Sequence, residues 1–261
     1  MNESNTMTAA DVRRFPIPEN IEVLWLFDSD AYLKAHHTYR AAKAGDSKSA
    51  LALITDVALL ELNQKTGRFG KDCIFVAPFA REASGDNAIP QVLSEVLAAL
   101  CEAIADKEIV QITKVYHTGA DPMERLALRP EFDGSVHVGG HYVLVDDVTN
   151  LGGTLAELAH FIQSKGGVVK AVVVMVNAGR NKSFTPDRRT LKTLKERFAN
   201  EIIETFGIHV DELTANEAQY LVGFRSADEL RNRLAKAKQE VDIRLRSKGI
   251  AGIFGTQDRQ T

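Results

Sequence analysis

The segment 142–155 carries the residue types, at the spacing, that could do chemistry in this chain. A short apolar run leads to two adjacent carboxylates, Asp146 and Asp147, and a glycine pair, Gly152 and Gly153, follows shortly after. Neighbouring side chains of a strand point to opposite faces. The two carboxylates can therefore bind different groups, such as two hydroxyls, or a hydroxyl and a metal ion.

The glycine turn adds the features of a phosphate site. Gly152 and Gly153 lack the Cβ atoms that would keep a ligand away from the backbone. We expect an amphipathic helix to begin at Thr154, so the turn presents free N–H groups at the positive end of a helix dipole. Such a turn, beside carboxylates that can hold ribose hydroxyls, predicts a cradle for ribose 5-phosphate.

Two β-α-β units are predicted to position these residues. The helix 154–165 has one apolar face, and Glu157, His160 and Gln163 lie on the opposite, polar face. The predicted order is strand 73–77, loop 78–89, helix 90–105, strand 109–116, irregular stretch 117–140, strand 142–145, helix 154–165 and strand 168–176. This alternation predicts an α/β fold with a doubly wound, mostly parallel sheet, and ligands at the carboxyl ends of its strands.

The flanking regions predict further elements. Residues 21–27 are predicted to form a strand, and residues 47–62 a helix that is capped near Asp46. Another helix should start after residue 186, because a proline there suits its first turn. Two capping-box patterns predict two more helices, at Thr214-x-x-Glu217 and Ser226-x-x-Glu229.

The segment 142–155 resembles the phosphoribosyl pyrophosphate (PRPP) signature of type I phosphoribosyltransferases. Val143–Val148 and Gly152–Thr154 match its apolar run, acidic pair and closing Gly-x-Thr, whereas Thr149–Leu151 depart from it. A hydroxyl donor to the phosphate is lost at Leu151. Asn150 stands where 6-oxopurine enzymes of the family place an aspartate as general base. Because Asn150 cannot take a proton, the resemblance argues against hypoxanthine or guanine chemistry by that route.

The resemblance implies an enzyme, a glycosyltransferase that moves ribose 5-phosphate from PRPP to a nitrogen of a nucleobase or amine and releases pyrophosphate. It implies Mg²⁺ as cofactor and gives Asp146 and Asp147 the catalytic and metal-binding roles. The residues that it assigns to PRPP are Asp146, Asp147, Asn150, Leu151, Gly152, Gly153, Thr154, Arg81, Arg125 and Arg129.

The order of elements is similar to the ComF-like branch of this family. On that resemblance, residues 77–81 form a pyrophosphate loop that contains Arg81. Residues 117–134 form a mobile cover that contains Arg125 and Arg129. The implied organisation is an N-terminal hood or extension, a phosphoribosyltransferase core and a C-terminal helical extension, over residues 1–70, 71–184 and 185–261. A homodimer is compatible with it, because dimers are common in this family.

Two other interpretations stay open. A protein of this fold can keep the cradle and use it to sense PRPP or a nucleotide without catalysis. The sequence Asp28-Ser29-Asp30 after a predicted strand resembles the nucleophile motif of haloacid dehalogenase-type phosphatases, with Asp146 and Asp147 as a later metal site. Tyr32 stands where those enzymes have threonine or valine, and a phosphatase does not explain the glycine turn.

The composition predicts a cytoplasmic protein. Of 261 residues, 44% are hydrophobic and 26% charged, and no apolar run reaches the roughly 20 residues that span a bilayer. We therefore expect no membrane partner. Cys73 and Cys101 lie in apolar surroundings, which is typical of core cysteines in a reducing compartment. The stretch 225–248 has eight basic and four acidic residues; contact with nucleic acid or protein is conceivable there, but a solvated amphipathic helix is favoured.

Overall fold

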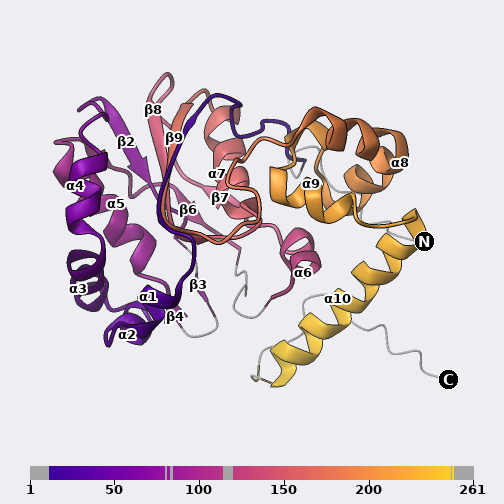
Figure 1. Ribbon diagram of the computed structural model, residues 1–261, viewed down its shortest axis with the longest axis horizontal. Helices are drawn as coiled ribbons and strands as arrows, with labels where there is room; N and C mark the ends of the chain where they lie inside the picture. The colour runs from indigo at the N-terminus through magenta and orange to yellow at the C-terminus, as the bar shows by residue number, and fades with distance from the viewer. Residues whose placement is uncertain (1–11, 80, 83–84, 114–119, 248, 250–261) are drawn as a thin grey trace.

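The computed structural model describes residues 12–79, 81–82, 85–113, 120–247 and 249. Its centre is a five-stranded sheet with the order β1-β9-β8-β2-β5, in which each neighbouring pair is parallel (Figure 1). The strands are β1 Glu22–Phe27, β9 Val168–Asn177, β8 His141–Thr149, β2 Cys73–Val76 and β5 Ile104–Ala105. The predicted doubly wound α/β fold is confirmed.

Helices cover both faces of this sheet (Figure 1). Helices α3 (Ser47–Val57) and α5 (Ile89–Leu100) contribute to one core, and α7 (Gly153–Ser164) contributes to the other. Side chains of β8 alternate between these cores: Val143 and Val145 join the first, and Tyr142 and Leu144 join the second. This arrangement explains why the strand is apolar at every position from Tyr142 up to the carboxylates.

Two segments of the predicted core differ from expectation. The helix predicted over 90–105 ends at Leu100, and Glu102, with a positive φ of 51°, reverses the chain into β5 beside β2. Of the strand predicted over 109–116, Val110–Gln111 (β6) is extended and pairs with Phe132–Asp133 (β7) in a separate antiparallel ribbon. The place beside β2 is taken by β5, so β6 does not join the central sheet. Residues 114–116 lie outside the described residues.

The N-terminal region contributes to the sheet and to the helices on one face. The predicted strand is β1, and it pairs with β9 at the edge of the central sheet. The predicted helix 47–62 begins at the expected cap, Asp46, but Ala58 divides it into α3 and α4 (Leu59–Lys65). Two short helices precede it, α1 (Ala31–Ala35) and α2 (Tyr39–Lys43). Whether this region acts as a hood over a ligand stays a prediction.

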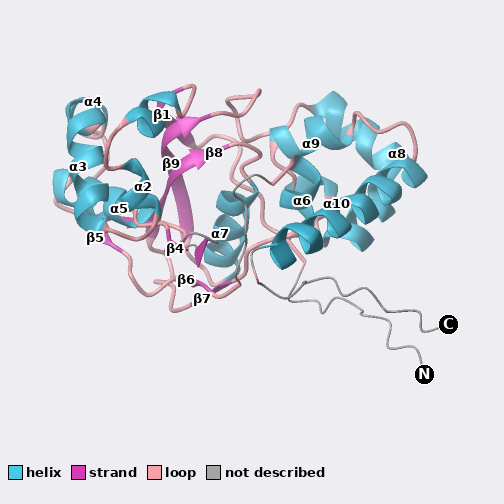
Figure 2. Ribbon diagram, turned by 90° about the horizontal axis from the view of Figure 1, so that it is seen from below, coloured by secondary structure: helices cyan, strands magenta, loops and turns pink. Residues whose placement is uncertain are grey.

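The remaining helices form a third core beside the sheet (Figure 2). They are α6 (Pro122–Ala127), α8 (Arg188–Phe206), α9 (Ala215–Leu221) and α10 (Ala227–Ser247), with a 3₁₀ turn at Val210–Glu212. The capping box of Thr214 and Glu217 is present as predicted. Helix α6 lies inside the predicted mobile cover, whose first residues, 117–119, fall outside the described chain. It buries Met123 and Leu126 in this core.

Residues Arg81–Glu82 (β3) and Gly85–Asp86 (β4) pair as an antiparallel ribbon within the stretch predicted as a loop. Among the described residues, no helix combines the length and the apolar character needed to cross a membrane.

Candidate active site

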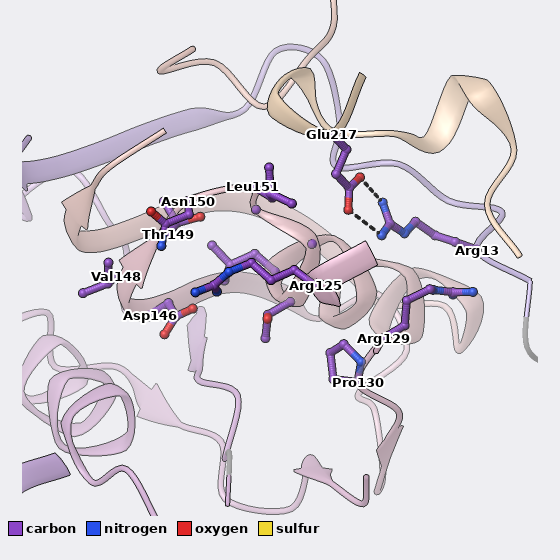
Figure 3. A pocket seen from close by; sticks show the side chains of 14 residues that line it. Arg13, Arg125, Arg129, Pro130, Asp146, Val148, Thr149, Asn150, Leu151 and Glu217 are labelled. Carbon is purple, nitrogen blue, oxygen red and sulfur yellow. Dashed lines mark hydrogen bonds and ion pairs between the residues drawn. The ribbon is translucent and has the colours of Figure 1, made fainter. Parts of the chain in front are cut away.

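A pocket lies where β8 ends and α7 begins, at the carboxyl edge of the sheet (Figure 3). The predicted glycine turn forms one wall, and side chains from the N-terminal segment, α6 and α9 form the others. The lining residues are Arg13, Arg125, Arg129, Pro130, Asp146, residues 148–155 and Glu217. The structure therefore brings together most of the residues that the sequence assigned to PRPP.

The two adjacent carboxylates of β8 have different surroundings: Asp146 lines the pocket, whereas Asp147 contacts Lys43 and Asn87. Asp146 is partly exposed and lines the pocket, and its Oδ1 accepts a hydrogen bond from the backbone N–H of Asp147 at 2.8 Å. Burial and the neighbouring Asp147 carboxylate raise the pKa of Asp146 well above its ordinary value. Asp146 is thus the carboxylate that a pocket ligand would meet.

Asp147 has a different role in the structure. It is only 4% exposed, and its Oδ2 accepts hydrogen bonds from Lys43 Nζ at 2.8 Å and Asn87 Nδ2 at 3.2 Å. Burial alone would raise the pKa of Asp147, but the Lys43 ammonium and these hydrogen bonds outweigh it and lower the pKa. Asp147 does not line this pocket; it connects the signature strand to α2 and to the loop just before α5.

The glycine turn packs closely against the C-terminal part of the chain. Gly152 has a φ of +83°, and a Cβ atom there would lie 2.6 Å from a ring carbon of Phe184. A Cβ atom on Gly153 would lie 2.8 Å from Glu217 Oε1. The Leu151 carbonyl accepts a hydrogen bond from Thr214 Oγ1. Packing therefore requires glycine at both positions, and the positive φ favours it further at Gly152.

Beneath the pocket lies a charge network that the sequence did not reveal. Glu157, predicted on the polar face of α7, is only 4% exposed. Its carboxylate accepts hydrogen bonds from Arg129 at 2.6 and 2.7 Å and from Arg13 Nε at 2.8 Å. Burial would raise the pKa of Glu157, but the two guanidinium groups lower it. The polar face of α7 is therefore buried at Glu157, and the helix pattern alone could not predict this because the partners of Glu157 come from distant parts of the sequence.

Arg13 joins this network to α9. The Arg13 side chain is fully buried, and it donates hydrogen bonds of 2.8 and 3.0 Å to the two carboxylate oxygens of Glu217 (Figure 3). Glu217 also accepts a hydrogen bond from the Thr214 N–H in the capping box. The sequence around Arg13 does not indicate that its side chain is buried. An arginine is rarely buried unless it is paired, and the partners of Arg13 lie far along the chain, in α7 and α9.

The three predicted pyrophosphate arginines have different environments. Arg125 and Asp146 point into the same space in Figure 3, and Arg125 Nε donates to the Ala120 carbonyl at 3.1 Å. Arg129 lines the pocket, but its guanidinium is bound by Glu157 and by the carbonyls of Phe206 and Gly207. Arg81 begins β3, where its backbone pairs with Asp86, and its contact with pyrophosphate stays a prediction.

The pocket carboxylate of Asp146 is of a kind that can coordinate a magnesium ion. Mg²⁺ commonly takes one or two protein carboxylates together with substrate phosphates. Asp146 can supply one such oxygen, whereas Oδ2 of Asp147 is already bound by a lysine. A second acidic group, Asp121, Glu124 and Glu240, lies elsewhere and contacts the guanidinium groups of α10.

The rival phosphatase motif lies away from this pocket. Asp28 follows β1, is separated from β8 by β9, and its side chain is 75% exposed. Its Oδ1 contacts Lys182 Nζ at 2.7 Å, and this ion pair lowers the pKa of Asp28. Asp28 and Asp146 therefore do not lie at one site in this structure.

The chain is similar to two curated proteins. It is 36% identical over 211 residues to Protein TraN of Escherichia coli, and the match covers 77% of this chain and 46% of TraN. It is 38% identical over 132 residues to an uncharacterized protein of Haemophilus influenzae, with 49% of this chain and 29% of that protein covered. The chain thus spans about half the length, or less, of these relatives. No protein-family model matches it.

Among solved structures, the chain has distant likenesses to adenine phosphoribosyltransferases. That of Thermoanaerobacter pseudethanolicus is 21% identical, with 51% of this chain and 70% of that chain covered and a TM-score of 0.32. That of Leishmania donovani is 16% identical, with 74% and 84% covered and a TM-score of 0.34. The parallel sheet and the pocket at its edge are features of this chain's own structure.

Proposed function

We propose that this pocket binds PRPP and that the protein transfers ribose 5-phosphate to a nitrogen nucleophile, with release of pyrophosphate. One observation carries the proposal: the pocket combines a partly exposed carboxylate, Asp146, with the glycine turn that begins α7. The first N–H groups of a helix have no partner within the helix and favour a phosphate. A carboxylate beside them suits ribose hydroxyls.

The reaction mainly requires charge and position. As the bond between C1 and pyrophosphate breaks, positive charge develops on the sugar ring and negative charge on the leaving group. Asp146 would hold the ribose, the N-terminus of α7 the 5-phosphate, and Arg125 the pyrophosphate. A magnesium ion bound with PRPP and Asp146 would neutralise part of the pyrophosphate charge. Asn150 cannot act as a base, so the nucleophile must lose its proton by another route.

The transfer is tested directly with PRPP, Mg²⁺ and a panel of nucleobases and amines. We expect release of pyrophosphate that depends on one of the acceptors. Pyrophosphate release at the same rate with no acceptor would indicate only hydrolysis. Hydrolysis of phosphomonoesters that is lost in Asp28→Asn would favour the phosphatase instead.

A sensing role is the second candidate, and two observations favour it. Asn150 replaces the general base known from part of the family, and the Asp147 carboxylate is bound by Lys43. Tight PRPP binding without turnover on any acceptor would support this role. Both candidates require the same pocket, so the PRPP-binding claim can be tested before they are separated.

A further inference from the structure

Arg125 lies on α6, a helix of only six residues. A helix this short has little stability of its own, so its position depends on its contacts. Its apolar side chains, Met123 and Leu126, pack in the third core. At its C-terminal side, Arg129 binds Glu157 of α7. The contacts that fix the N-terminal turn of α6 are therefore also needed to position Arg125.

Asp121 and Glu124 form a capping box at that turn, and both side chains also contact arginines of α10. Asp121 Oδ1 accepts hydrogen bonds from the N–H groups of Met123 and Glu124, at 2.8 and 3.0 Å. Its second oxygen, Oδ2, contacts the guanidinium of Arg233 on α10. Both oxygens of this capping carboxylate are thus bound, one within α6 and one by α10.

The other half of the capping box has the same arrangement. Glu124 is only 2% exposed, and its Oε2 accepts a hydrogen bond from the Asp121 N–H at 3.2 Å. The same oxygen accepts one from Arg244 of α10 at 2.8 Å. Charge-assisted hydrogen bonds of this kind are stronger than neutral ones. Helix α10 therefore holds both capping side chains of α6.

We propose that α10 positions Arg125 in the pocket, because Arg233 and Arg244 hold the two capping residues of the helix that carries it. This proposal rests on the proposed function only for the ligand that Arg125 meets. It gives the basic stretch 225–248 an intramolecular role, since two of its arginines contact α6 and its cap. Arg233 and Arg244 are positioning residues and do not line the pocket.

The first test needs no ligand. Arg244→Met should speed amide hydrogen exchange at Arg125 and Leu128 by about tenfold, because loss of the Arg244 contact favours local opening of α6. The N–H groups of these two residues bond to the carbonyls of Asp121 and Glu124. Exchange in α7 should not change. Arg231→Met is the matched control, because Arg231 lies on α10 but contacts Asp228 and Glu201 instead. Unchanged exchange in α6 of Arg244→Met would overturn the proposal, whether or not PRPP binds.

The second test uses PRPP with Mg²⁺ and calorimetry. Arg244→Met should weaken PRPP binding by about tenfold, because displacing the Arg125 guanidinium weakens a charge-assisted contact with phosphate. Arg244→Lys, which keeps the ion pair with Glu124, should restore most of the affinity. In an Arg125→Met background, Arg244→Met should cause no further loss, because the group that it positions is absent.

The outcomes separate the two proposals. Equal losses from Arg244→Met with and without Arg125 would indicate a general effect on structure and would overturn the positioning role. If wild-type protein binds no PRPP, the proposed function fails, and the exchange experiment alone decides the role of α10.

Discussion

At the scale of residues, Asp146 and Asp147 are neighbours in one strand with opposite surroundings. Asp147 is buried against the Lys43 ammonium, whereas Asp146 lines the pocket and accepts a hydrogen bond from the Asp147 N–H. The sequence predicted that the pair would diverge. It could not predict that Lys43 would bind one member, because that contact spans more than a hundred residues.

The raised pKa of Asp146 predicts a pH effect on stability. Its folded pKa lies above the unfolded value of about 3.9, so the folded state loses stability as pH rises from there through the folded pKa. We expect Asp146→Asn to be more stable than wild type at pH 7 and its stability to depend less on pH. Urea unfolding between pH 4 and 8 measures how the stability of each protein depends on pH. Asp228→Asn is the control, because the Asp228 side chain is exposed. A less stable Asp146→Asn at pH 7 would contradict this expectation.

Gly152 provides a second prediction, which separates backbone strain from packing. Gly152→Ala should destabilise the protein by about 2–4 kcal/mol, because it combines a positive φ with a clash against Phe184. Gly139 has a similar φ of +73°, but a Cβ atom there would have no described atom within 4 Å beyond its chain neighbours. Gly139→Ala should therefore cost only about 1 kcal/mol. Denaturant unfolding compares the two. Equal losses of stability in the two variants would show that the Phe184 ring can move away from the added Cβ atom.

At the scale of elements, the sequence predicted the strand–turn–helix unit of β8 and α7 well. Apolar periodicity and glycine positions are local signals, and they were sufficient here. The environment of Glu157 was not predictable in this way. Its burial depends on Arg13, which lies 144 residues before it, and on Arg129. Helix α6 was missed for a different reason. Asp121 and Glu124 form a local capping box and Pro122 lies in the first turn, but six residues are too few to show a helical periodicity.

Glu157 yields a prediction for α7. Glu157→Gln keeps the shape of the side chain but leaves Arg129 and part of Arg13 without a counter-charge, so it should destabilise the fold by about 3 kcal/mol. Glu196→Gln, on the exposed side of α8, should change stability by less than about 0.5 kcal/mol. Thermal and urea unfolding of both variants measure this. A Glu157→Gln protein as stable as Glu196→Gln would mean that the network contributes little.

At the scale of the whole molecule, distant parts of the chain meet around the pocket. The N-terminal segment supplies Arg13, and the C-terminal part supplies Thr214 and Glu217, which contact the glycine turn or the residues that support it. The family resemblance implied a C-terminal helical extension over 185–261. Local patterns find the helices of such a region but not their contacts with a turn far earlier in the chain.

These shared contacts predict one cooperative unfolding transition. Trp25, the single tryptophan, lies in β1 and reports on the sheet, while far-ultraviolet circular dichroism reports largely on the helices. We expect the two signals to change at the same urea concentration. A chain ending at residue 184 should lack a cooperative transition. Two separate transitions in the full chain would instead support an independent C-terminal domain.

Calorimetry with PRPP and Mg²⁺ tests most directly whether the pocket beside Asp146 binds PRPP. Asp146→Asn should weaken binding at least tenfold, since a charge-assisted hydrogen bond contributes roughly 1.5–3 kcal/mol. Asp28→Asn, which changes an exposed carboxylate outside the pocket, should bind as wild type does. Wild-type affinity in a correctly folded Asp146→Asn protein would contradict the account.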